Sequence, residues 1–416
     1  MTMDSELIEK FLRAKAASLV LFNTPDVQKN LALNEISKAL FEHAEELKQA
    51  NRKDLERIQE ASLVELEPLD AIVRELFSIM ELPDPNGDVF DSKDLPNELK
   101  LTKYRIPLGH IGLVLDQCPE RVMTGAALSI KSGNTLLIWA GKAIEETVRV
   151  LVRVIQMGLE VANLPLDIVQ VMRSHEEKDL MEFLQFKEGL DLILVRATHP
   201  ITEFCQKHGQ IPMLFEKRAV CHAYVDQLVH IEKAVQVVVN AKIQKTKANN
   251  SISTVLIHES IAAQFIPLLF KALENEEISF RLDSIAWNYY IALGTDTMDV
   301  QMADPHDWDK GEGSKFLNMK IVSQIDQAIE HIQKHGTGHC ECILSDHPLH
   351  AMIFTSYVNA SAIVINTSTR FYEGTQMELG PEILSSSQKA YSNGPIGLKE
   401  LMTYKWLIQG NYQIRE

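Results

Sequence analysis

The chain has 416 residues, of which 45% are hydrophobic and 24% charged, a composition typical of a soluble globular protein with two or three compact units. Asp and Glu outnumber Lys and Arg by 57 to 41, which gives a formal net charge of −16. This acidic balance argues against nucleic-acid binding, because phosphate neutralisation requires a basic surface.

The sequence predicts a cytoplasmic protein without a membrane segment. No window approaches the roughly 18 uncharged apolar residues that a membrane span requires. The first residues, MTMDSELIEKFLRAK, lack the apolar core of a signal peptide. Five scattered cysteines, an odd number, favour reduced thiols over a disulfide scaffold.

The first 60 residues are expected to be helical. Thr24 has the residue type of an N-cap, Pro25 that of a first helical position, and Asp26 would face the positive end of the helix dipole. Apolar residues recur at helical spacing between residues 36 and 47. We therefore expect this helix to pack against a larger body.

The pattern changes at about residue 99. The segment LKLTKYRIPLGHIGLVLD contains two strand-like runs separated by Pro107 and Gly109. Short apolar runs (NTLLIW, IVQVM, DLILVR) then alternate with amphipathic segments (AIEETVRVLVRVIQMGLEVA, EKDLMEFLQF). Such alternation predicts a parallel sheet covered by helices.

A second series of the same kind follows. The strand-like runs are VCHAYVD, STVLIH, MKIVSQ, CECILS and AIVIN, and the helical segments include IEKAVQVVVNA, IAAQFIPLLFKALE and DQAIEHIQKH. Between them, GTDTMDVQMADPHDWDKGEGSK is acidic and rich in turn formers, which predicts a surface loop. The last segment, YKWLIQGNYQIRE, is predicted to be a strand that pairs with another element or another subunit.

Several long segments, in this order, resemble the gamma-glutamyl phosphate reductase family of the aldehyde dehydrogenase superfamily. They are RIPLGHIGLVLD, ALSIKSGNTLLIWAGKA, VCHAYVD, VVVNAKIQ, IVSQIDQAIEHIQKHGTGH, INTSTRF, LGPEILSSSQK and GPIGLKELMTYKW. The resemblance covers nearly the whole chain. It implies an α/β fold of the aldehyde dehydrogenase type, with two parallel-sheet domains, a β-hairpin and a C-terminal tail.

The resemblance also implies domain limits. Residues 1–225 would form the nucleotide-binding domain, to which residues 366–401 return, and residues 226–365 the catalytic domain. Residues 97–107 and 402–416 would form the oligomerisation hairpin and tail of a homo-oligomer.

The family reduces gamma-glutamyl phosphate to glutamate 5-semialdehyde with NADPH in proline biosynthesis. A cysteine thiolate attacks the acyl phosphate, and hydride then reduces the thioester. Counting from the segment NAKIQ, the place of this cysteine falls on Asn249. A carboxamide has no proton that ionises near neutral pH and is a poor nucleophile.

Other positions implied by the resemblance also differ from the family. The family's RPN segment is Cys118, Pro119 and Glu120 here, so an acid replaces the asparagine that steadies the oxyanion, and a carboxylate there would repel the developing charge. In place of the family's IPRGG the chain has LVRAT, in which only Arg196 is kept. Trp139 replaces a basic residue near the cofactor's adenosine, and the GAE segment has become GPE.

The resemblance also implies positions for NADP binding, all of which lie in the segments compared with the family. These positions are Lys131, Ser132, Asn134, Gly141, Lys142, Arg196 and Glu382. The segment KSGN at residues 131–134 would cradle a phosphate, or it would be a solvated turn before a buried strand. No metal is expected, because the His and Cys residues of HGTGHCEC lack two-residue zinc spacing.

Two hypotheses follow. The chain is a degenerate family member, a pseudoenzyme that keeps the fold for binding or assembly, with glutamate 5-kinase or an active paralogue as partner. Alternatively, it is an active reductase or aldehyde dehydrogenase with an altered substrate or a displaced nucleophile, for which Cys118 is the first candidate.

Overall fold

The computed structural model describes residues 5–58, 64–173, 176–216, 218–294, 298–311 and 315–415. They form two compact units: unit 1 contains residues 1–216, 378–385 and 395–416, and unit 2 contains residues 217–377 and 386–394. The first division therefore falls at residue 216, whereas the sequence analysis placed it at residue 225. Residues 366–377 and 386–394, expected in the first domain, cluster with unit 2.

Unit 1 is built on a parallel sheet with strand order β5-β4-β3-β6-β7. Its strands are β3 (His110–Leu115), β4 (Thr135–Ala140), β5 (Val169–Val171), β6 (Leu192–Arg196) and β7 (Met213–Phe215). Its helices are α1 (Ser5–Phe22), α2 (Asp26–Glu42), α3 (Ala44–Leu55), α4 (Leu69–Glu81), α5 (Arg121–Ser132), α6 (Glu145–Val161), α7 (Glu177–Gln185) and α8 (His199–His208), with the short 3-10 helices η2 (Lys142–Ile144) and η3 (Leu166–Ile168).

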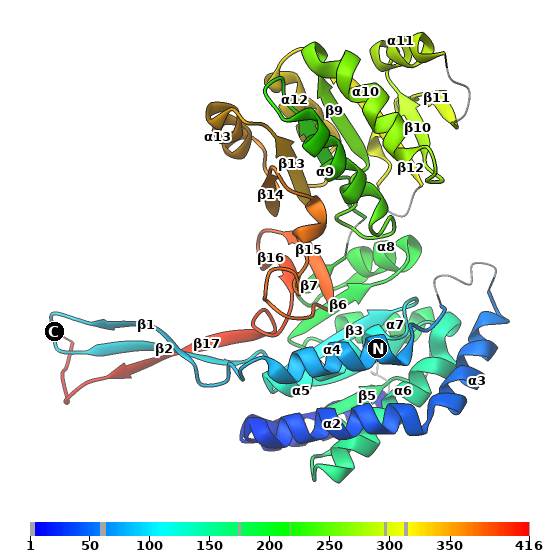
Figure 1. Cartoon of the computed structure of the whole chain (residues 1–416). Helices are drawn as coiled ribbons and strands as arrows, with labels where there is room; N and C mark the ends of the chain where they lie inside the picture. Colours follow the sequence, from blue (N-terminus) through cyan, green and yellow to red (C-terminus); the bar gives the residue numbers. More distant parts are fainter. Residues whose placement is uncertain are drawn as a thin grey trace. The chain divides into compact units, whose positions relative to one another are not determined.

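Both faces of this sheet are covered by helices (Figure 1). Side chains alternate along a strand, so Leu113 faces the core formed with α2, α4, α5 and α6, while Val114 faces the core formed with α7 and α8. Because both faces are buried, β3 and β4 read as continuous apolar runs in the sequence. The predicted parallel α/β layer is therefore confirmed.

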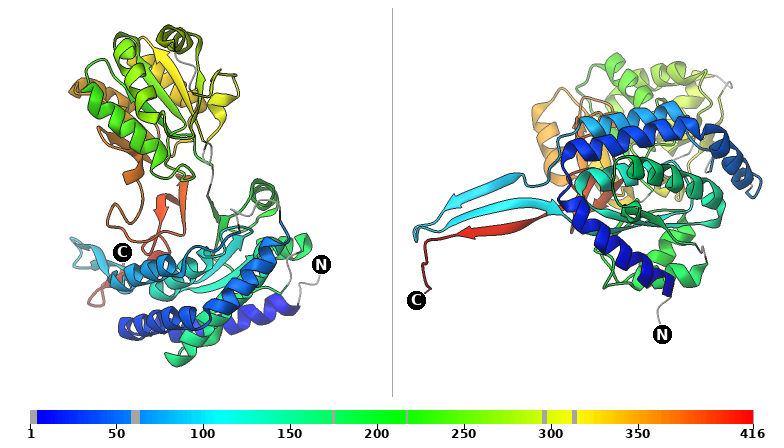
Figure 2. Two further views of the ribbon diagram at one scale, coloured as in Figure 1. Left: turned by 45° about the vertical axis from the view of Figure 1, so that its right-hand side comes forward. Right: turned by 90° about the horizontal axis from the view of Figure 1, so that it is seen from below.

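Three antiparallel strands form a separate ribbon in unit 1, with the order β1-β2-β17. They are β1 (Val89–Asp94), β2 (Lys100–Pro107) and β17 (Met402–Gln409), and they extend away from the rest of the unit (Figure 1, Figure 2). Residues 402–409 pair with β2 along their whole length, so the first part of the predicted terminal strand, residues 404–409, is confirmed. Residues 410–415 are not in a strand.

Unit 2 contains a second parallel sheet, with strand order β11-β10-β12-β9-β8-β13-β14. Its strands are β8 (His222–Val225), β9 (Thr254–His258), β10 (Ser279–Leu282), β11 (Val300–Met302), β12 (Phe316–Val322), β13 (Cys340–Leu344) and β14 (Ala362–Ile365). Its helices are α9 (Ile231–Ile243), α10 (Glu259–Leu273), α11 (Ser284–Leu293), α12 (Ile325–His335) and α13 (Pro348–Tyr357), with η4 (Asp307–Asp309) and η5 (Thr369–Phe371).

The helices of unit 2 also lie on both faces of its sheet. The apolar residues of α9, α10 and α11 share one core with Val255 and Ile257. Those of α12 and α13 share another with Leu256 and Ile343. The hairpin β15 (Leu384–Gln388) and β16 (Ser392–Ile396) follows and is divided between the two units.

Two local predictions were wrong. The acidic segment 294–315 is not only a loop: it contains β11, which pairs with β10, and η4, in which Asp307 is buried; residues 295–297 and 312–314 lie outside the described part. Thr24 does not cap the next helix, because its hydroxyl donates back to the carbonyl of Val20 and α2 begins at Asp26 after Pro25. In the described part of the chain no helix has the length and apolarity needed to cross a membrane.

Candidate functional site

The order of strands in unit 1 points to one edge of its sheet. The chain runs from β3 outward to β4 and β5, and then returns to β6 and β7 on the other side of β3. In open parallel sheets, ligands bind outside the carboxyl ends of the strands at such a reversal. The segments that leave β3 and β6 there are residues 116–120 and 197–198. They include Glu120, and they adjoin Arg196.

Asp116 and Thr198 connect these two segments. The Thr198 amide donates to Asp116 Oδ1 over 2.7 Å, and its hydroxyl contacts Oδ2. Burial raises the pKa of Asp116. Gly141 lies beside them, since a Cβ there would come within 2.7 Å of Asp116 Cβ, and its amide donates to the Leu115 carbonyl over 2.7 Å. Two backbone donors at this edge are therefore already used within the protein.

Glu120 is a buried carboxyl group at the start of α5, with 4% of its surface exposed. Among the described residues no group donates to its Oε2 atom, and Arg121 Nε is 3.9 Å from Oε1. Burial raises the pKa of Glu120 more than Arg121 lowers it. The expected repulsive carboxylate is thus shifted towards the neutral acid, which the sequence did not reveal.

The other predicted positions near this edge are held in different ways. Arg196 Nε pairs with Glu216 Oε2 at 3.0 Å, and Nη1 donates to the Ile383 carbonyl over 2.9 Å. Lys142 is exposed on η2, and Glu382 is half-buried. Trp139 is 2% exposed and belongs to the core on the α7 and α8 face, so this side chain points away from solvent.

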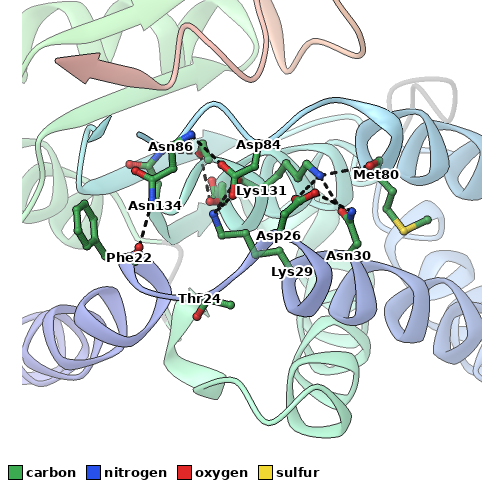
Figure 3. A network of polar contacts seen from close by, with 12 residues as sticks. Phe22, Thr24, Asp26, Lys29, Asn30, Met80, Asp84, Asn86, Lys131 and Asn134 are labelled. Atoms are coloured by element: carbon green, nitrogen blue, oxygen red, sulfur yellow. Dashed lines mark hydrogen bonds and ion pairs between the residues drawn. The ribbon is translucent and has the colours of Figure 1, made fainter. Parts of the chain in front are cut away.

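The segment of residues 131–134 is buried, so the alternative of a solvated turn is wrong. Figure 3 shows the polar contacts of Lys131 with Asp26, Asn30 and Met80. Lys131 is 0% exposed, and its Nζ atom donates to Asp26 Oδ1, Asn30 Oδ1 and the Met80 carbonyl over 2.5, 2.8 and 3.3 Å. These three bonds use all the donors of an ammonium group. Lys131 therefore ties α5 to α2 and α4.

Asn134 and Ser132 complete this buried turn. Asn134 Nδ2 donates to Ser132 Oγ over 2.6 Å and to the Leu401 carbonyl over 2.7 Å. Its Oδ1 accepts the Gly109 amide at 2.7 Å. The structure brings Lys131, Ser132 and Asn134 together, and the bonds of Lys131 and Asn134 go to groups of the protein itself.

Asn249 lies in unit 2, in the turn between α9 and β9, and is half-buried. Its carbonyl accepts the Cys221 thiol at 3.3 Å. The next residue, Asn250, fixes the turn: its Nδ2 donates to the Tyr372 carbonyl over 2.9 Å, and its carbonyl accepts the Thr369 hydroxyl at 2.5 Å. Arg370 also contacts the Oδ1 atom of Asn250.

Sequence reasoning missed two charged residues at this turn. Arg370 Nε donates to Gln244 Oε1 over 2.7 Å, so its guanidinium links both ends of the turn. Lys242 is 2% exposed, its Nζ donates to the Ile252 carbonyl over 3.1 Å, and burial lowers its pKa to about 8. Ser251 Oγ donates to the carbonyl of Lys242, not to a basic side chain. The segment INTSTRF, already noted for its resemblance, contains Arg370 and was the available signal.

The five cysteines all lie in the described part of the chain, and none of them forms a disulfide. Burial raises the pKa of Cys205 to about 12 and raises the pKa of Cys118, Cys340 and Cys342 as well. The reactive thiolate is therefore disfavoured at these four positions. Within the described ranges, no group of three or more His, Cys, Asp or Glu side chains could hold a metal ion.

The buried carboxyl of Glu120 leads to a prediction about stability. Its folded-state pKa is raised above the ordinary 4.5. The stability that the protonated carboxyl group gives the folded state is therefore fully present below pH 4.5, and it is lost as the pH rises through the raised pKa. Glutamine at this position does not ionise, so Glu120→Gln does not lose stability as the pH rises. We expect this substitution to stabilise unit 1 by about 1–3 kcal/mol near neutral pH. Thermal unfolding of the unmodified chain and of Glu120→Gln between pH 4 and 8 measures the difference in stability. A stability difference that narrows with rising pH would contradict the raised pKa of Glu120.

Comparisons with known proteins agree on one family. The aldehyde dehydrogenase family model matches residues 3–284. The gamma-glutamyl phosphate reductase of Histophilus somni (strain 129Pt) is 34% identical over 412 residues, covering 97% of this chain and 98% of its own, and that of Roseiflexus castenholzii is 34% identical over 414 residues, with the same shares covered. The crystal structure of the Thermotoga maritima gamma-glutamyl phosphate reductase has a TM-score of 0.92 at 32% identity, covering 99% of this chain and 100% of that one.

A more distant structure, an acetylating aldehyde dehydrogenase from Geobacillus thermoglucosidasius, is 15% identical with a TM-score of 0.73, covers 99% of this chain and 98% of that one, and shares the fold. The predicted aldehyde dehydrogenase-like architecture is confirmed by these matches. The chain belongs to the gamma-glutamyl phosphate reductase family, within the aldehyde dehydrogenase family.

Proposed function

We propose that this chain is a catalytically degenerate gamma-glutamyl phosphate reductase, a pseudoenzyme that keeps the fold of its family. The observation that carries the proposal is Asn249 at the position the resemblance assigns to the nucleophilic cysteine. The covalent step that the resemblance implies uses a thiolate as its nucleophile, and a carboxamide cannot supply one. The turn itself is well ordered by Asn250 and Arg370, so the framework of the site is kept while its reactive atom is absent.

The alternative of a displaced nucleophile receives no support from the four cysteines whose pKa is raised. Cys118, the first candidate, is half-buried, and its pKa is raised by burial and then by the nearby Glu120. The Ser251 hydroxyl donates to the Lys242 carbonyl, and among the described residues no basic side chain accepts from it. An unactivated hydroxyl and a disfavoured thiolate are both poor nucleophiles at neutral pH.

The family resemblance implies NADP, and the residues at the carboxyl ends of β3 and β6 do not fit its phosphates. Anionic phosphates need free backbone donors or cations. Here the Thr198 amide is bonded to Asp116, and the half-buried Asp116 and the buried Glu120 adjoin the same edge. Lys131, assigned to this role by the resemblance, has its donors occupied by the protein. We therefore derive no step through the nucleotide.

What remains is a role in assembly. We infer a homo-oligomer formed through the β1-β2-β17 ribbon, on which Tyr404, Trp406 and Ile408 are exposed. An active paralogue could join the same kind of interface in a mixed oligomer. Glutamate 5-kinase is the other partner, because its labile acyl phosphate product gives the two enzymes reason to associate. The proposed location is the cytoplasm.

The test is the oxidation of glutamate 5-semialdehyde with NADP and phosphate by the purified full chain. The Thermotoga maritima reductase serves as the positive control. We expect the rate to be lower than that of the control by roughly three orders of magnitude or more, because removing a catalytic nucleophile lowers the rate by at least this factor. A parallel titration with NADPH, followed by nucleotide fluorescence, is expected to show no binding. Turnover comparable to the control would overturn the proposal.

A further inference from the structure

A cavity of about 330 Å³ lies entirely within unit 2. Residues at the end of α12, in the turn before β13, at the start of β14 and in the loop of the β15–β16 hairpin line it, among them Gln333, Gly336, Ser361, Lys389 and Asn393. Its volume lies at the lower end of the roughly 300–1,000 Å³ found for small-molecule sites. Most of the lining side chains are polar, which suits a small polar ligand.

Glu341 lines this cavity and is 0% exposed. Its Oε2 atom accepts both the His222 amide at 2.8 Å and His222 Nδ1 at 2.9 Å. Its Oε1 atom has no hydrogen-bond partner among the described residues. Buried polar atoms are paired in the great majority of proteins, so an unpaired oxygen on a residue that lines a cavity is a candidate contact for a ligand.

The backbone of Gly336 lies close beside this oxygen. A Cβ at residue 336 would lie 2.9 Å from Glu341 Oε1, closer than a side chain could stay. Burial raises the pKa of Glu341, whereas the two bonds from His222 favour the ionised form. An ammonium group next to Oε1 would favour the ionised form further.

The rim of the cavity carries the opposite charge. Lys389 is exposed, and its Nζ atom donates to Asn359 Oδ1 over 2.6 Å. An ammonium group has three donors, so two remain for a ligand. Ser361 and Asn393 add a hydroxyl and an amide nearby. The cavity therefore combines a buried carboxyl group at its wall with a cation at its rim.

We propose that this cavity binds a free α-amino acid, with the ligand's ammonium group on Glu341 Oε1 and its carboxylate on Lys389. A zwitterion satisfies both charges at once, which a simple amine or a simple acid does not. The inference needs no reductase chemistry, so it stands or falls separately from the proposed loss of catalysis.

Isothermal titration calorimetry of the full chain with L-glutamate, L-proline and L-alanine, each alone, tests the proposal. Acetate and methylammonium serve as controls that carry one charge each. We expect at least one amino acid to bind, and each control to bind about tenfold more weakly or worse, because a charge-assisted contact is lost. Absence of binding by all three amino acids at millimolar concentration would overturn the proposal, and so would acetate binding as tightly as the best amino acid.

Variants locate the site. Lys389→Met should weaken binding about tenfold, while Lys389→Arg should retain it within a few-fold, because the cation is kept. Lys271→Met, at an exposed lysine of α10, is the matched control and should leave binding unchanged. Glu341→Gln should also weaken binding, with circular dichroism confirming that the chain is folded. Binding that neither Lys389→Met nor Glu341→Gln alters would place the amino acid elsewhere and refute the site.

Discussion

Replacing Arg370 with methionine is expected to lower the free energy of unfolding of unit 2 by about 2–4 kcal/mol, because buried acceptors lose a charged donor. Arg370 is 9% exposed and bonds to Gln244 and Asn250 on the turn that contains Asn249. Asn250 is itself 4% exposed, so water cannot replace the lost donor without local opening. The contact with Glu373 is more exposed and should contribute less.

Differential scanning calorimetry measures this effect, since a chain with two compact units can unfold in more than one transition. Arg74→Met, at an exposed arginine of α4, is the matched control and should change stability by no more than about 0.5 kcal/mol. If Arg370→Met unfolds at the same temperature as the unmodified chain, then Arg370 does not hold the turn as we describe.

The buried parts of the fold could be predicted from the sequence because burial leaves a pattern. A strand covered on both faces must be apolar throughout, and NTLLIW and DLILVR therefore identified β4 and β6. One strand that escaped prediction, β1, is largely exposed. β1 has the sequence VFDSKD and pairs with β2 through its backbone. Because its side chains are mostly exposed, they do not form the apolar pattern by which a strand is predicted.

The polar interactions of the site were harder to predict because their partners are distant in sequence. Lys131 has the sequence context of a solvated turn, yet its ion-pair partner Asp26 lies 105 residues earlier. The contact between Asn250 and Arg370 spans 120 residues. Counting along a family segment could find the position of Asn249, but not the bonds that order its turn. The raised pKa of Glu120 likewise depends on burial, which no local pattern reveals.

Asn249→Cys is expected to give the chain a reactive thiol without restoring reduction by NADPH. The position is half-buried in an ordered turn, so a thiol placed there can be reached by a small ester. Its thiolate would attack the carbonyl of p-nitrophenyl acetate, forming a thioester while p-nitrophenolate leaves. We expect a burst of about one p-nitrophenolate per chain, with an acylation rate on the order of 100-fold or more above that of the unmodified chain, by analogy with the losses on removing a nucleophile.

Asn249→Ala is the matched control and should show no burst, because it changes the same position without adding a nucleophile. Neither protein should consume NADPH, since at the carboxyl ends of β3 and β6 in unit 1 the Thr198 amide is bonded to Asp116 and the buried acid Glu120 follows β3. A burst from the unmodified chain would reveal a nucleophile other than residue 249 and end the pseudoenzyme proposal. NADPH consumption by Asn249→Cys would show instead that the nucleotide still binds, so that catalysis was lost at the nucleophile alone.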